Sequence, residues 1–128
     1  MMKITLESLP LKKKNYEVKQ TVKNMRLTQK LQKDFAETRE KLEKLQKEID
    51  NTEKGSDKME ELGIEMLEVP MLSAEKAVDY IVDVLKLKTK EVDKIEDSLE
   101  PSEVITIANE ISMKLLGVDP ADLEESKK

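Results

Sequence analysis

Apolar and polar residues alternate at the start of the chain. The apolar members of the first alternation are Met2, Ile4 and Leu6. A second alternation runs from Tyr16 to Val22, and Pro10 and Asn15 bound a polar, lysine-rich connection between the two. A period of two residues is typical of half-buried strands, so residues 1–22 are predicted to form a small β-hairpin. Because an isolated hairpin is marginal in water, it should pack on the rest of the chain.

The period changes to that of a helix in residues 23–51. Apolar residues and Thr38 recur there at alternating steps of four and three, which is the spacing of a coiled-coil seam. Charged residues fill the flanks, and pairs such as Glu37 with Lys41 stand in the favourable order for a solvated helix. We therefore expect one long charged helix. Its seam is expected to support homo-oligomerisation, or instead to close on the rest of the domain, through Leu31, Phe35, Leu42, Leu45 and Ile49.

Residues 52–72 are expected to form a linker and a short helix. The segment from Asn51 to Asp57 has turn-forming residues and no apolar member. A short amphipathic patch follows it, made of Met59, Leu62, Met66 and Leu67. Pro70 should end that helix, since proline lacks the backbone N–H that helix continuation needs.

Residues 73–117 are predicted to form a helical subdomain. Ser73 is placed as the N-cap of a helix that runs to about Lys86 and is apolar on more than one face. A further helix begins near Thr89, and a last one opens with Pro101 in its first turn and stops near Gly117. Residues 118–128 are polar and are expected to form a flexible tail. The fold class is thus mainly α, with several amphipathic helices and a small N-terminal β-hairpin.

Composition narrows the function. The 128 residues contain no histidine, cysteine or tryptophan, while 40% are charged. The usual proton shuttle, thiol nucleophile and soft metal ligands are therefore missing. The aromatic residues are Phe35, Tyr16 and Tyr80, too few to wall a dry pocket for carboxylate chemistry. We expect a binding protein with no enzymatic activity, no cofactor and no metal.

Charge is segregated along the chain. Residues 1–54 carry 14 Lys or Arg against 9 Asp or Glu, net +5, and residues 55–128 carry 9 against 19, net −10. Such complementary fields could steer head-to-tail association or docking to a charged partner, or they could be two solvated faces. The run from Lys12 to Lys14 has no aromatic platform beside it, so nucleic acid is not an expected partner. No apolar run approaches the roughly 20 residues that span a bilayer, so neither is a membrane.

Several segments together resemble the tail assembly chaperones of long-tailed phages of Gram-positive hosts. They are residues 2–6 (MKITL), 16–23 (YEVKQTVK), 77–85 (AVDYIVDVL) and 97–105 (DSLEPSEVI), with the amphipathic helix that follows the last of them. The resemblance implies a mainly helical, self-associating viral protein that coats the long helical tape measure protein until the tail tube forms. It also implies a location in the host cytoplasm and absence from the mature virion.

The helices predicted at residues 74–86 and 101–116 offer more apolar surface than so small a core can bury. Their stripes are the expected partner-binding residues, namely Val78, Ile81, Val82, Leu85, Ile107, Ile111 and Leu115. The alternative for each of them is an ordinary place in the core. The alternative function is a small helical regulator or adapter that dimerises through the seam of residues 23–51.

Overall fold

A computed structural model describes residues 2–117, and the predicted tail at 118–128 lies outside the described residues. Strands β1 (Met2–Thr5) and β2 (Asn15–Val18) pair in antiparallel register, with Ile4 opposite Tyr16. Ile4, Tyr16 and Val18 are buried, as the alternation requires. The connection between the strands also buries apolar side chains, those of Leu6, Leu9 and Leu11. The predicted hairpin and the mainly α fold class are both confirmed.

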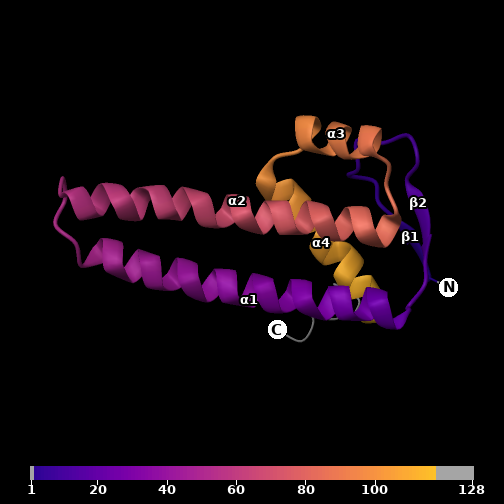
Figure 1. Cartoon of the computed structure of the whole chain (residues 1–128), viewed down its shortest axis with the longest axis horizontal. Helices are drawn as coiled ribbons and strands as arrows, with labels where there is room; N and C mark the ends of the chain where they lie inside the picture. The colour runs from indigo at the N-terminus through magenta and orange to yellow at the C-terminus, as the bar shows by residue number, and fades with distance from the viewer. Residues whose placement is uncertain (1, 118–128) are drawn as a thin grey trace, which may run out of the picture.

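Two long helices form the body of the molecule. Helix α1 (Val22–Asp50) begins at the N-cap Thr21, whose hydroxyl accepts a hydrogen bond from the backbone N–H of Asn24 at 3.1 Å. Helix α2 (Asp57–Leu85) begins at the N-cap Ser56. The turn between them contains Gly55 at φ 81, a left-handed conformation that glycine adopts at little cost. The helices lie side by side as a long helical hairpin (Figure 1).

The expectation that a helix ends at Pro70 is wrong, and so is the placement of Ser73 as an N-cap. Helix α2 continues through both residues, so the predicted short helix and the helix predicted from Ser73 are one helix. Proline removes one helical hydrogen bond, which is a local cost. Continuation buries Val69, Ser73 and Ala77 along the helix, and this tertiary packing outweighs the local preference.

Two shorter helices complete the chain. Helix α3 (Thr89–Ser98) and helix α4 (Pro101–Leu115) begin close to the predicted positions, with Pro101 at the start of α4. Helix α4 packs mainly on α2, and near its end the Gln20 side-chain amide donates to the backbone carbonyl of Leu115 at 2.8 Å. Figure 1 shows both strands, α3 and α4 gathered at the end of the hairpin away from its turn.

The core has two parts. The main cluster joins the β-hairpin, the N-terminal half of α1, the C-terminal half of α2, α4, and α3 through the fully buried Ile95. A smaller cluster of Leu45, Leu62 and Val69 holds the other half of the helical hairpin. The helical hairpin of α1 and α2 therefore extends well beyond the main core. Few apolar side chains are buried in the half that carries the turn.

Candidate protein-binding surface

Most of the residues predicted to bind a partner are core residues of this chain. The buried ones are Ile81, Leu85, Ile107, Ile111 and Leu115. They belong to the main cluster on α2 and α4, so in the folded chain their side chains contact other parts of the same molecule. Val78 and Val82 are only half-buried. Partner binding at all seven residues stays a prediction.

The seam predicted for self-association faces α2. Leu31 lies in the main cluster, and Phe35 is half-buried against it. Leu45 is buried with Leu62 and Val69 of α2. Leu42 and Ile49 are half-buried against the same small cluster. The hairpin thus covers the seam within one chain, and self-association through it stays a prediction.

The exposed apolar residues concentrate on α2. The exposed fractions are 56% for Ile64, 74% for Leu67, 50% for Met71 and 54% for Leu72. Ile64, Leu67 and Met71 are spaced three and four residues apart, and Val78 follows one heptad later, so these side chains form one stripe. The sequence contains this stripe, but a helix break expected at Pro70 divides it into two unrelated parts.

The stripe borders two adjoining cavities. One, of about 560 Å³, is lined by Ile64, Leu67, Met71 and Leu72 together with charged neighbours. The other, of about 440 Å³, lies where α2 meets the connection from α3 to α4, and Val78 and Leu99 are among its lining residues. Met71 and Glu75 border both cavities, so the two adjoin, and we call them together the α2 groove.

Carboxylates surround the α2 groove. They are Glu65, Glu68, Glu75 and Asp79 on α2 and Glu96 on α3. Among the described residues that line the groove, Lys41 alone is basic. The ion pairs within residues 2–117 join Lys76 to Asp34 at 3.9 Å and Lys114 to Glu110 at 3.4 Å. Neither pair uses a groove carboxylate, so the rim is acidic and not neutralised by the chain itself.

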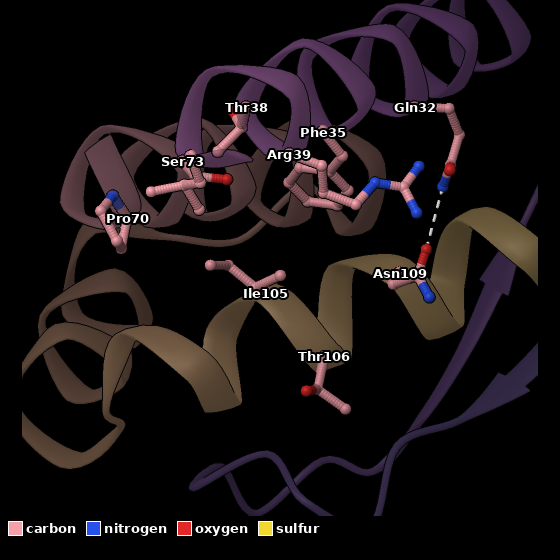
Figure 2. Close-up of a pocket in the computed structure, with 10 residues that line it drawn as sticks. Gln32, Phe35, Thr38, Arg39, Pro70, Ser73, Ile105, Thr106 and Asn109 are labelled. Atoms are coloured by element: carbon pink, nitrogen blue, oxygen red, sulfur yellow. Dashed lines mark hydrogen bonds between the residues drawn. The ribbon is translucent and has the colours of Figure 1, made fainter. Parts of the chain in front are cut away.

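A third cavity, of about 370 Å³, lies among α1, α2 and α4 (Figure 2). The Gln32 amide donates to Asn109 Oδ1 at 3.0 Å and to the Ser112 hydroxyl at 2.6 Å across its end. Figure 2 shows Phe35 and Arg39 projecting from α1 in this region. None of the described residues around this cavity is acidic. It lacks the paired acid and base that proton-transfer chemistry requires, and its hydrogen bonds fasten α4 to α1.

Two features of the described residues bear on what the chain can bind. In the part of the chain that the structure describes, no three His, Cys, Asp or Glu side chains converge in a way that could hold a metal ion. None of the helices within residues 2–117 combines the length and the apolar character needed to cross a membrane.

The fold and the groove define a class of protein: a small, mainly α-helical protein whose second long helix presents an apolar stripe with an acidic border. The chain belongs to the phage tail assembly chaperones, because the family model described as "Phage tail assembly chaperone proteins, TAC" matches residues 2–128. This confirms the resemblance noted in the sequence. No curated protein and no solved structure gave a significant match to the chain. Membership implies that the protein works with phage tail proteins during tail assembly.

Proposed function

We propose that the chain is a non-catalytic chaperone that binds and shields the tape measure protein during tail assembly, and that the α2 groove holds the client. The observation that carries this proposal is the row of exposed apolar side chains on α2, which includes Ile64, Leu67 and Met71. Large exposed apolar patches on a folded protein mark interaction sites. The chain's own core is filled by other residues, so these side chains are free to meet another molecule.

The shape of the groove suits a helical client. From Ile64 to Val78 the stripe spans about 21 Å, at about 1.5 Å per residue, which matches about four turns of a docked helix. Heptad-like spacing on one helix is suited to side-by-side packing with another. One copy would cover only a short piece of a long client, so shielding it would require many copies, consistent with the expected homo-oligomer.

The chaperone would act by binding alone. Apolar client helices would be kept from one another in the host cytoplasm until the tail tube polymerises around the client. Release would follow from mass action, because the tube offers a larger interface. The chaperone would then be absent from the mature virion. No Gly-rich phosphate loop occurs in the sequence, so no nucleotide is invoked.

The test is co-expression with the tape measure protein of the same phage, followed by affinity purification. Wild-type chain should co-purify with soluble client. Leu67→Asp should stay folded, since Leu67 is exposed, and should lose the client. Val22→Asp is the matched control, because Val22 is equally exposed but lies at the start of α1. Retention of the client by Leu67→Asp, or an equal loss of the client in both variants, would overturn the groove assignment.

A further inference from the structure

We infer that the client segment held in the α2 groove is an amphipathic helix that carries lysine or arginine beside its apolar stripe. This inference rests on the proposed function, because it names the chemistry of the partner for the same groove. It goes beyond that function because it assigns a charge pattern to the client helix, which the shape of the groove alone does not specify.

The first support is the sign and number of the rim charges. Five carboxylates border the groove, and Lys41 is the one base among the described lining residues. A helix with acidic flanks would bring like charges together as water leaves the interface, which opposes binding. A helix with basic flanks would meet opposite charges along the same length, which both steers its approach and sets its register.

The second support is the placement of the carboxylates on both walls. Near Val78, Glu75 and Asp79 come from α2, whereas Glu96 comes from α3. A docked helix would therefore meet acidic side chains on either side of its apolar face. Basic residues on both flanks of the client stripe would satisfy this arrangement, and a single charged edge would not.

A second copy of this chain is the obvious competing occupant. Its most basic stretch has exposed side chains and no acid between them, at Lys19, Lys23, Arg26, Lys30 and Lys33. That stretch offers one exposed large apolar side chain, Val22, which cannot fill a stripe of four or five. Two copies joined groove to groove would set their carboxylate rims against each other. The charge and the apolar content of this chain's own surfaces therefore favour a helix of another protein as the occupant of the α2 groove.

The experiment uses the full chain and two synthetic helical peptides of about 18 residues, long enough to cover the groove. Both peptides carry the same leucine and isoleucine heptad, with flanks of lysine in one and glutamate in the other. The groove variant is the double change Glu68→Lys and Glu75→Lys. The matched control is Glu40→Lys with Glu43→Lys, an equal change of net charge at exposed positions of α1. Circular dichroism checks that both variants fold.

The lysine-flanked peptide should bind wild-type chain at least about tenfold more tightly than the glutamate-flanked one, since several weak exposed pairs act together. Added salt should shrink the difference. The groove variant should abolish or reverse it, and the control variant should keep it. This set of results would support the inference.

Other outcomes overturn it in distinguishable ways. Equal binding of both peptides, lost in Leu67→Asp, would reject the charge pattern while the groove remained the client site. An equal loss of preference in the control variant would assign it to net charge alone and also reject the inference. If neither peptide binds, and Leu67→Asp still co-purifies with the tape measure protein, the proposed client site itself fails. Self-association abolished by Met71→Asp, with no peptide binding, would make a second copy the occupant.

Discussion

The hydroxyl groups of Thr28 on α1 and Tyr80 on α2 lie 2.7 Å apart in the core, and both side chains are almost completely buried. Thr28 also donates to the backbone carbonyl of Asn24 at 2.8 Å. A hydroxyl has one proton, so Tyr80 is the donor in the contact between the helices. This hydrogen bond ties α1 to α2 at one register, and the buried Ser112 hydroxyl of α4 lies close to the same tyrosine hydroxyl.

Replacing either partner should lower stability. Tyr80→Phe removes the donor and should reduce the free energy of unfolding by about 1 kcal/mol. Thr28→Val removes the acceptor that α1 provides for the tyrosine hydroxyl and should cost about 1–3 kcal/mol. Urea denaturation measures both changes. The double variant should cost less than the two single changes added together, and strict additivity would show that the two hydroxyls do not interact.

Stability should also fall in alkali. Burial raises the pKa of the Tyr80 hydroxyl above its ordinary value of 10.0, and hydrogen bonding to Thr28 and Ser112 partly opposes that rise. Above about pH 10 the unfolded chain loses this proton before the folded chain does, so stability decreases as pH rises from there. Below that pH the contribution is fully present. Unfolding free energies measured from pH 8 to 11 should decline less steeply for Tyr80→Phe than for wild type. Identical slopes would contradict the burial effect.

Helix α2 should become more stable when its proline is removed. Pro70→Ala restores a backbone N–H within a helix that already continues on both sides, and the gain should be about 1–3 kcal/mol. Thermal unfolding followed by circular dichroism measures it, with Pro10→Ala in the β1–β2 connection as the control. An unchanged or lower melting temperature for Pro70→Ala would argue against a continuous α2.

Core and groove residues should respond differently to truncation. Ile111 is fully buried, so Ile111→Ala should cost about 2–5 kcal/mol of stability. Leu67→Ala should stay within about 0.5 kcal/mol of wild type, because its side chain is exposed. Chemical denaturation compares the two. The converse test is Ile111→Asp, which should be unfolded or insoluble. A folded Ile111→Asp that loses the client would instead restore Ile111 as a binding residue.

The α1 seam should act within one chain. Leu45→Ala should lower stability by about 2–4 kcal/mol, because Leu45 is buried against α2. The loss should be the same at all protein concentrations, since a contact within one chain does not depend on mass action. Light scattering at matched concentrations should give the same mass for wild type and variant. A smaller mass for Leu45→Ala would place self-association in this seam.

The periodicity of apolar residues predicted the secondary structure correctly where one face of an element is buried and the other is exposed to solvent. It located the start of α1 near Val22 and the Pro101 start of α4 within a residue or two. It also located the β-hairpin, although β2 ends at Val18 and the alternation continues to Val22. It failed at Pro70, where a local rule favoured a break and long-range packing of Val69 and Ser73 favoured continuation. That single error hid the stripe that joins Leu67 to Val78.

The candidate site was less predictable than the fold for the same reason. The sequence does not distinguish an apolar residue that faces the core from one that faces solvent. Ile81 and Val78 lie on one helix, three residues apart, yet Ile81 is completely buried and Val78 is half-exposed and lines the same cavity as Met71. Which face α1 and α4 cover depends on contacts between segments distant in the chain, and no periodicity encodes those contacts.

By itself, the sequence determined the helical class, the absence of histidine and cysteine chemistry, the charge asymmetry and the family. These features depend on the composition of the chain and on the spacing of residues that are close together in the sequence. Only the tertiary structure decided that α2 passes through Pro70, that Ile81 and Ile111 are core, and that the exposed stripe lies within an acidic rim. The physical reason is that burial is a property of the assembled chain: each helix has several apolar faces, and only packing selects the one that remains in water.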